Sequence, residues 1–421
     1  MKILLNVYAC EPNRGSEPGV GWHWAVELAK DKTKEVHVLT RANNKDIIDG
    51  YWVNNDKPDN LHFHYYDLPK VLVWAKHHGM PVNLYYSLWL YGAGCYAKKL
   101  NSKFHFDMAH HLTFGVFRDA PFLFRLNVPY VIGPVGGGEY TPASLMCLYG
   151  TAKGKFVERL RKFVNKISVL NPYYYVSYRR ASLILTKTDE TRAALGYNSF
   201  RDKSVTKLEI GIDRVCPCSS EERDKHTFIY VGRFIFLKAI ELTLQAFKIY
   251  HDRFDDEARL VLIGKGELRG RIESFAKEYN LEDSIEIIDW VEQKKLQRYY
   301  QRCTAMLFPS LHDSSGNVVL EALSNGMPVV SLDCGGPAVV LGEELKSLVV
   351  KVGNNNVNDV ADDIAKTLSR VVENGDVYTS ISNQCLERAK KMLWSETVCE
   401  TYKLIGQRLF SENTIDRNEI L

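Results

Sequence analysis

Short apolar runs alternate with longer segments of helical periodicity along most of this 421-residue chain. This alternation is typical of parallel β-sheets that are covered by helices on both faces. Two groups of runs are expected to form strands: residues 3–9, 35–40, 108–111, 130–133 and 183–186, then 228–231, 260–263, 285–288, 305–308 and 329–332. The sequence therefore predicts an α/β protein with two sheets.

The length of the chain favours two domains, because single cores cluster near about 100 to 200 residues. A polar stretch at residues 211–225 separates the two groups of runs. We expect a first domain over residues 1–205 and a second over 206–393. Apolar residues between Trp394 and Leu409 recur at helical intervals, so we expect residues 394–421 to hold a terminal helix.

Composition and cysteine spacing bear on where the protein is located and whether it holds a metal. Hydrophobic residues make up 45% of the chain and charged residues 25%, as in an average folded domain. No apolar run reaches the roughly 20 residues that span a bilayer, and the N-terminus lacks the pattern of a signal peptide. Nine cysteines without a regular spacing fit reduced thiols, and the close pair Cys216 and Cys218 lacks a second ligand pair for zinc. We expect a cytoplasmic protein without a metal.

Charge is unevenly distributed along the chain. Residues 1–200 carry 25 Lys and Arg against 16 Asp and Glu, although the whole chain has a net charge of +3. Much of the excess lies in residues 153–180, where basic residues alternate with apolar ones at helical spacing. This segment is either a solvated helix face or a basic amphipathic surface for anionic lipid. No nucleic-acid-binding motif accompanies it.

A glycine-rich loop follows the first expected strand. It contains Gly15, Glu17, Gly19 and Gly21, and a helical pattern begins soon after it. Glycines permit close approach of a ligand at the carboxyl end of a parallel strand, and the helix N-terminus offers unpaired N–H groups. Tight turns also need glycine, so the loop is either a ligand loop or a turn.

The second group of strands opens with a similar turn. Gly232 and Arg233 follow the first of these strands, and Lys238 comes five residues later. Two cations at one edge of a sheet can converge on a diphosphate. A further turn after the next strand contains Gly264.

The most specific element is the segment of residues 310–328. Asp313 and Glu321 bracket a loop of small residues and the start of an apolar helix. Amides near Gly316, Asn317 and Val318 can meet anionic or hydroxyl-rich groups, while the carboxylates accept hydrogen bonds from sugar hydroxyls. A simple helix cap is the alternative role for Asp313.

The order and spacing of these motifs resemble the donor-binding half of the family 4 retaining glycosyltransferases. The resemblance rests on Gly232-Arg233 with Lys238, on Asp313 and Glu321 eight positions apart, and on Gly326-Met327-Pro328 followed by Asp333-Cys334-Gly335-Gly336. The glycine-rich loop, residues 133–139 and residues 208–213 also occupy family positions. The resemblance implies the GT-B fold: two Rossmann-like domains that face each other across a cleft, with the last helix crossing back to the first.

The same resemblance implies roles for individual residues. Arg233 and Lys238 would bind the donor diphosphate, Glu321 the nucleotide ribose, and Asp313 the hydroxyls of the transferred sugar. Two positions depart from the family pattern, which usually has Glu at Asp313 and Gly at Ala239. The shorter carboxylate at Asp313 bears on the identity of the donor sugar.

Candidates on the acceptor side come from the first domain. The resemblance implies a histidine beside the donor sugar, and His110 and His111 both stand at the end of an expected strand. Successive side chains of a strand point to opposite faces, so at most one of the two is expected to line the cleft. Glu17 and Glu139 are further acceptor-side candidates.

Together these residues predict a retaining, metal-independent glycosyltransferase that needs no cofactor. It would move a sugar from a nucleotide-diphosphate donor to a glycan or lipid-linked acceptor, in surface polysaccharide assembly at the inner face of the membrane. Two alternatives remain. One is a sugar-nucleotide epimerase or a phosphorylase of the same architecture, and the other is a non-catalytic sugar-nucleotide-binding protein.

Overall fold

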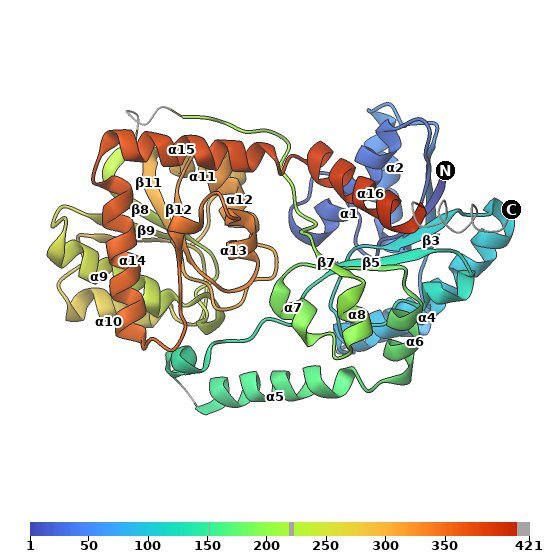
Figure 1. Ribbon diagram of the computed structural model, residues 1–421, viewed down its shortest axis with the longest axis horizontal. Coiled ribbons are helices and arrows are strands. Elements are labelled where there is room, and N and C mark those ends of the chain that lie inside the picture. Colours follow the sequence, from blue (N-terminus) through green and yellow to red (C-terminus); the bar gives the residue numbers. More distant parts are fainter. Residues whose placement is uncertain (151, 219–222, 411–421) are drawn as a thin grey trace, which may run out of the picture. The chain divides into compact units, whose positions relative to one another are not determined.

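A computed structural model describes residues 1–150, 152–218 and 223–410 of the chain (Figure 1). The chain divides into two compact units. Unit 1 consists of residues 1–138, 163–210 and 394–421, and unit 2 consists of residues 139–162 and 211–393. Residues 139–162, which we expected in the first domain, therefore cluster with the second unit. Residues 219–222 of the expected linker and 411–421 of the expected terminal segment lie outside the described residues.

Unit 1 is built on a parallel sheet of seven strands in the order β3-β2-β1-β4-β5-β6-β7. The strands are β1 (Lys2–Asn6), β2 (Glu35–Arg41), β3 (Leu61–Tyr66), β4 (Met108–His111), β5 (Tyr130–Val135), β6 (Leu183–Thr186) and β7 (Ser204–Thr206). Strands β1, β4, β5 and β6 are almost entirely buried, since helices cover both faces of the sheet.

The helices of unit 1 follow the strands along the chain. They are α1 (Ser16–Lys30), α2 (Lys45–Val53), α3 (Lys70–His77), α4 (Val82–Phe104), α6 (Pro172–Arg180), α7 (Asp189–Ala194), α8 (Asn198–Asp202) and α16 (Trp394–Phe410), with short 3₁₀ turns η1 (Ala42–Asn44) and η2 (Phe122–Leu126). The terminal helix α16 packs on α1, where the Trp394 ring stacks on His23 at 4.5 Å between ring centroids. The predicted terminal helix is therefore part of unit 1.

Unit 2 is built on a parallel sheet of six strands in the order β10-β9-β8-β11-β12-β13. The strands are β8 (Asp224–Val231), β9 (Arg259–Ile263), β10 (Ile285–Ile288), β11 (Cys303–Phe308), β12 (Val329–Leu332) and β13 (Val349–Val350). Strands β8 and β11 lie at the centre, and their paired residues include Phe228 with Ala305 and Ile229 with Met306. The loops that follow these two strands therefore meet at one edge of the sheet.

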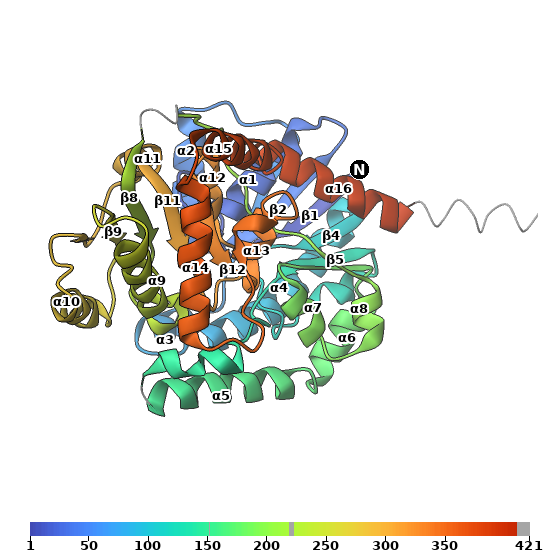
Figure 2. The same cartoon turned by 60° about the vertical axis from the view of Figure 1, so that its left-hand side comes forward.

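The helices of unit 2 are α9 (Ile240–Arg253), α10 (Arg269–Glu278), α11 (Gln293–Arg302), α12 (Asn317–Ser324), α13 (Gly335–Leu341), α14 (Val357–Val372) and α15 (Gly375–Lys390), with 3₁₀ turns η3 (Ala143–Tyr149), η5 (Phe236–Lys238) and η6 (Lys346–Leu348). Helix α14 packs along α9, and α15 packs on α12 (Figure 2). Helix α5 (Ala152–Ser168) contains the point at which the chain passes from unit 2 to unit 1.

Two elements of unit 1 differ from the expectation. Helix α1 begins at Ser16, so Gly19 and Gly21 lie inside the helix rather than in a loop before it. A Cβ on Gly19 would lie 2.0 Å from the carbonyl oxygen of Arg14, which shows that glycine lets the helix pack against its own entry loop. Strand β3 was not expected, because its sequence alternates His62 and His64 with apolar residues.

None of the helices in the described part of the chain is both long and apolar enough to cross a bilayer.

Candidate functional site

Four predicted site residues of unit 2 lie on loops and a helix at the carboxyl edge of its sheet. Arg233 and Lys238 follow β8, and Asp313 follows β11, the neighbouring strand. Glu321 lies on α12, which begins four residues after Asp313. Parallel strands end at the same edge of a sheet, and ligands of α/β proteins favour that edge.

Lys238 and Asp313 form a close ion pair. The Nζ atom of Lys238 lies 2.5 Å from Oδ2 of Asp313 and donates a longer hydrogen bond, 3.4 Å, to the carbonyl oxygen of His312. The other carboxylate oxygen of Asp313 accepts hydrogen bonds from the amides of Ser315 and Gly316 at 3.1 and 3.0 Å. Burial alone would raise the pKa of Asp313, but the charge and hydrogen bond of Lys238 outweigh it, so the pKa is lowered. Asp313 is therefore ionised at neutral pH.

Asp313 also organises the loop in front of α12. Its carboxylate accepts hydrogen bonds from the amides two and three residues further along the chain, those of Ser315 and Gly316, as in a capping turn. Gly316 has φ +76°, a left-handed conformation that glycine adopts at little cost. The first-turn amides of Asn317 and Val318 follow it, and such amides have no acceptor within their own helix. The loop can thus present N–H groups to an anionic ligand.

Glu321 lies one turn further along α12, where its Oε2 atom accepts a hydrogen bond from the Tyr300 hydroxyl at 3.1 Å. Burial raises the pKa of Glu321, and the Tyr300 bond only partly opposes this effect. Beside it lies a cavity of about 190 Å³ lined by Ile212, Asp213, Arg214, Cys216, Gln293, Gln297, Tyr300, Glu321, Ser324 and Asn325. A half-buried carboxylate at the wall of a polar cavity can accept hydrogen bonds from vicinal hydroxyls of a ligand.

The turns that contain Gly232 and Gly264 pack against each other. The amide of Gly232 donates to the carbonyl of Ile263 at 2.9 Å, and a Cβ on Gly264 would lie 1.9 Å from the carbonyl oxygen of Gly232. Arg233 leaves this turn with an exposed side chain. Burial raises the pKa of Tyr230. The charge of Asp313 adds to this rise, and the charge of Arg233 opposes it, so both charged groups influence the ionisation of the Tyr230 hydroxyl. Gly232 and Gly264 are thus explained by packing at the edge of the sheet.

Ala239, where the family pattern has glycine, adopts φ +47° and ψ 44°. This left-handed conformation costs roughly 1 kcal/mol or more for a residue with a Cβ atom. Ala239 is 2% exposed and joins η5, which ends in Lys238, to α9. Ala239 therefore adopts the left-handed backbone conformation that glycine would adopt more easily.

The predicted histidines of unit 1 are both buried, and protein groups occupy all four ring nitrogens. His110 donates from Nε2 to the carbonyl of Gly133 at 2.7 Å, and its Nδ1 lies 3.0 Å from the Tyr402 hydroxyl. Nδ1 of His111 lies 3.2 Å from the side-chain amide nitrogen of Asn6, and its Nε2 lies 3.1 Å from the Tyr86 hydroxyl. Burial lowers the pKa of His110 to about 4 and that of His111 to about 3. Both imidazoles are therefore neutral at pH 7.

Glu17 belongs to an ion-pair network at the carboxyl edge of the unit 1 sheet. Lys187, which follows β6, lies 2.6 Å from the carboxylate of Glu209 and 3.4 Å from that of Glu17. The second oxygen of Glu17 accepts a hydrogen bond from the amide of Phe114 at 2.8 Å. Gly15 is the N-cap of α1 at the start of this region, and a Cβ there would meet nothing within 4 Å. Lys187 was not predicted, since a lone lysine after a strand carries no recognisable pattern.

Glu139 lies with the donor-side residues of unit 2. Its carboxylate accepts a hydrogen bond from the Ser314 hydroxyl at 2.9 Å, and Glu139 is 1% exposed. His312 packs in the same region, where burial and the charge of Arg161 lower its pKa. Glu139 was expected on the acceptor side, and no pattern in the sequence singled out His312 or Ser314.

Comparisons with known proteins show which proteins the chain is similar to. Residues 219–391 match the family model described as glycosyl transferases group 1. An uncharacterized glycosyltransferase of Methanocaldococcus jannaschii is 27% identical over 194 residues, which are 43% of this chain and 47% of that protein. The 2-deoxystreptamine N-acetyl-D-glucosaminyltransferase of Niallia circulans is 27% identical over 158 residues, 37% of this chain and 40% of the relative. The matches thus span about half the length of the curated relatives or less.

Solved structures resemble the chain over nearly its whole length. A sucrose-phosphate synthase of Thermosynechococcus elongatus superposes with a TM-score of 0.62 at 18% identity, covering 98% of this chain and 99% of that one. HepE of Anabaena in complex with UDP superposes with a TM-score of 0.61 at 12% identity, covering 97% and 100%. These identities establish the architecture alone. The chain has the GT-B fold, and its residues 219–391 are similar to the group 1 glycosyltransferases.

Proposed function

We propose that this protein is a retaining glycosyltransferase that binds a nucleotide-diphosphate sugar at the carboxyl edge of the unit 2 sheet. The observation that carries the proposal is the Lys238–Asp313 ion pair at the foot of α12. It places a cation for phosphate and a carboxylate for sugar hydroxyls beside the open amides of a helix N-terminus. HepE, a structural relative, is solved with UDP and with UDP-glucose.

Each part of the donor has a matching group in unit 2. Lys238 and the exposed Arg233 would bind the diphosphate, with the amides of Asn317 and Val318 beside them. Glu321 and its polar cavity would hold the nucleotide ribose. Asp313 would accept hydrogen bonds from the transferred sugar. Its ionised state suits that role, because a carboxylate accepts and does not donate.

In the proposed reaction the bond between the anomeric carbon and the diphosphate oxygen breaks, and a bond from the acceptor oxygen forms on the same face. The acceptor proton passes to an oxygen of the leaving phosphate. Negative charge grows on the nucleotide diphosphate as it departs, and Lys238 and Arg233 are positioned to stabilise it. These side chains would do what a divalent metal does in other transferases, so transfer is expected to persist in a chelator.

The test combines binding and transfer. The protein is screened by thermal shift against nucleotide sugars, because a ligand of the native state raises the unfolding midpoint. The stabilising donor is then incubated with glycan and lipid extracts in EDTA, and the anomeric configuration of the product is read by NMR. Transfer with retention by the native protein, and loss in Arg233→Ala, supports the proposal. Undiminished transfer by that variant, or donor binding without any transfer, contradicts it.

The epimerase alternative is separated by the same experiment. An epimerase or phosphorylase converts the donor without a glycan or lipid acceptor, whereas a transferase requires one. Conversion at the full rate in the absence of acceptor would favour the alternative.

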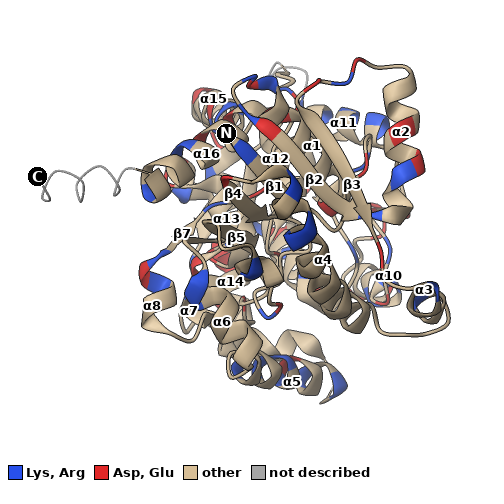
Figure 3. Ribbon diagram, turned by 90° about the vertical axis from the view of Figure 1, so that its right-hand side faces the viewer, with Lys and Arg blue, Asp and Glu red and all other residues tan. Residues whose placement is uncertain are grey.

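We also propose that helix α5 brings the acceptor side to an anionic membrane in surface polysaccharide assembly, from the cytoplasmic face. The helix exposes an apolar stripe of Phe156, Val157, Leu160, Phe163, Val164 and Ile167. Lys and Arg recur along the same helix (Figure 3). Aromatic and aliphatic side chains flanked by cations are typical of helices that lie in the membrane interface.

Vesicle sedimentation tests the membrane proposal. The native protein should sediment with vesicles of anionic phosphatidylglycerol and less with neutral phosphatidylcholine. Phe156→Ser with Phe163→Ser should lower sedimentation about tenfold or more, since each removes apolar area from the interface. Val53→Ser, at an exposed apolar residue of α2, is the control. Equal sedimentation of native and variant proteins contradicts the role of α5.

A further inference from the structure

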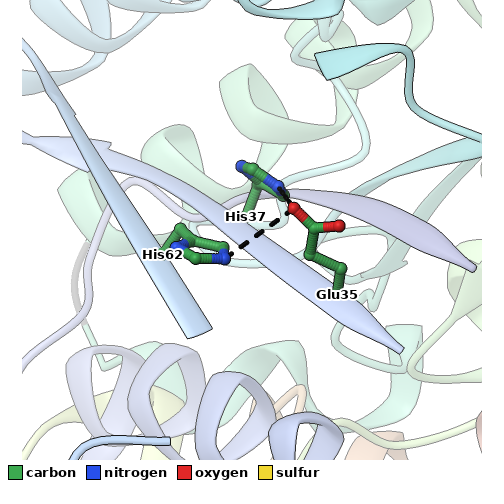
Figure 4. A group of neighbouring side chains, drawn as sticks. All are labelled: Glu35, His37 and His62. Carbon is green, nitrogen blue, oxygen red and sulfur yellow. Dashed lines mark hydrogen bonds and ion pairs between the residues drawn. The ribbon is translucent and has the colours of Figure 1, made fainter. Parts of the chain in front are cut away.

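Three potential metal ligands converge on one face of strands β2 and β3 in unit 1. They are Glu35 and His37 of β2 and His62 of β3 (Figure 4). One ligand atom from each residue lies within 4.8 Å of the other two. The convergence follows from the sheet, because residues two apart on a strand share a face and His37 is paired directly with His62.

The distances place the donor atoms around a common point. The Nε2 atom of His37 lies 3.0 Å from Oε1 of Glu35, and the Nε2 atom of His62 lies 3.8 Å from the same oxygen. Separations of about 3 to 4 Å are those of ligands that share one ion, whose bonds to nitrogen and oxygen are about 2.0–2.2 Å long.

A fourth residue orients the buried ligand. His37 is 1% exposed, and its Nδ1 atom lies 2.9 Å from Nε2 of His64, in a nearly coplanar arrangement. Phe104 and Phe106 pack against the His37 ring at 4.5 and 5.1 Å between ring centroids. Nε2 of His64 can accept a hydrogen bond from Nδ1–H of His37, and in that tautomer Nε2 of His37 carries no proton and can bind a metal. Histidine ligands in metal sites commonly make this second hydrogen bond.

A lysine competes with a metal ion for one of the ligands. The Nζ atom of Lys2 lies 3.6 Å from Oε2 of Glu35, and the Lys2 side chain is 42% exposed.

We propose that Glu35, His37 and His62 bind a divalent transition metal of the zinc type. Two imidazole nitrogens and one carboxylate oxygen suit Zn²⁺ or Co²⁺, whereas Mg²⁺ and Ca²⁺ prefer oxygen ligands alone. The ion would join edge strand β3 to β2 at the end of the strands where β2 begins. This end is opposite to the carboxyl edge of the same sheet, so the site has no part in the proposed transfer and would stabilise unit 1.

No metal was expected from the sequence, because it shows no second Cys or His pair at ligand spacing and resembles a metal-independent family. The ligands come from two strands whose paired residues are 25 positions apart in the chain, as in His37 with His62 and Leu39 with His64. Strand β3 was not expected to be a strand. The residue types were visible in the sequence, but their convergence depended on the register of the two strands.

Titration of the tag-free, full-length protein with Co²⁺ tests the proposal. The d–d absorption should saturate at one equivalent, and Zn²⁺ but not Mg²⁺ should displace the cobalt. His62→Ala and Glu35→Gln should each weaken binding about tenfold or more, because loss of even an outer partner commonly costs 10- to 100-fold. Both side chains are over one-third exposed, so both variants should fold. His77→Ala, at an exposed histidine of α3, is the matched control and should bind as the native protein does.

Two further measurements sharpen the test. Lys2→Gln should tighten binding about two- to fivefold, the range expected when one exposed ion pair is removed. Zn²⁺ should raise the unfolding midpoint of the native protein and of His77→Ala, but not that of His62→Ala. Equal affinity in His62→Ala and the native protein, or no saturable binding at all, would overturn the proposal. None of these readouts depends on the donor or on transfer.

Discussion

The ammonium of Lys238 lies 2.5 Å from the carboxylate of Asp313, and the two side chains are only 13% and 20% exposed. Each charge is thus largely withdrawn from water and balanced by the other. Removing one partner leaves the second unpaired, which commonly costs about 3–5 kcal/mol. The pair therefore couples the stability of unit 2 to the residues that we expect to bind the donor.

Replacing Lys238 alone and then both partners separates the effect of the ion pair on stability from its effect on transfer. Lys238→Met should destabilise the protein by about 3 kcal/mol and lower transfer about 100-fold or more, since a charge-stabilising group is lost. Lys238→Met combined with Asp313→Asn should recover most of the stability, because no unpaired charge remains, but should not recover transfer. Urea unfolding and initial rates provide the two measurements. Recovery of transfer in the double variant would contradict the role of Lys238.

Asp313 predicts an acid-sensitive contribution to stability. Its folded pKa lies below the ordinary value, so its contribution is present above the unfolded pKa near 3.8 and is lost as pH falls through the folded pKa. Asp313→Asn should be less stable than the native protein at pH 7, and the gap should narrow as pH falls below the unfolded pKa of about 3.8. Urea midpoints measured between pH 3 and pH 8 check this.

Ionisation of Glu321 should affect stability in the opposite direction to ionisation of Asp313. Burial raises its pKa, so the protonated form favours folding and this gain is lost as pH rises through the folded pKa. Glu321→Gln should therefore be more stable than the native protein at pH 7, by about 0.5–2 kcal/mol, while binding donor more weakly. The difference should shrink as pH falls through the raised folded pKa and be smallest below the unfolded pKa of about 4.5. A stability gap that is constant with pH would rule out ionisation as its cause.

Ala239 predicts a stabilising substitution beside the site. Its φ of +47° is strained for alanine, and Ala239→Gly should stabilise unit 2 by about 1 kcal/mol despite the greater freedom of glycine in the unfolded chain. Ala246→Gly, in the interior of α9, is the control and should destabilise by about 1 kcal/mol. Unfolding midpoints in urea distinguish the two signs.

Replacing Lys187 should greatly lower the stability of unit 1. It is 6% exposed on its side chain and pairs with Glu209, which is 3% exposed, so Lys187→Met should cost about 3–5 kcal/mol. Lys207→Met is the control, because Lys207 pairs with the half-exposed Glu400 and such pairs contribute about 0–1 kcal/mol. Similar losses in both variants would show that burial does not govern these pairs.

Much of the donor-side edge could be predicted because it follows from local pattern. Apolar runs predicted the C-terminal parts of β8 and β11, and parallel strands bring their following loops to one edge. Arg233, Lys238 and Asp313 were therefore located by chain order alone. The ion pair itself depends on side-chain packing, which no spacing rule describes.

Other features depended on contacts between distant segments. Gly19 and Gly21 suggested a loop, but their lack of side chains serves helix packing. Strand β3 was missed since its His62 and His64 interrupt the apolar pattern, although alternation places both on one face. The role of Lys187 depends on its ion pair with Glu209, which is 22 residues away in the chain and next to it at the edge of the sheet.

The assignment of Glu139 to unit 2 has a consequence for how the chain can be divided. The chain passes from one unit to the other after Gly138, Lys162, Ile210 and Leu393. Neither unit is therefore one uninterrupted stretch of polypeptide. A gene split near codon 205 would yield a front half that lacks α16 and a back half that lacks the Glu139 segment, so each product would begin folding without a piece that only the other supplies.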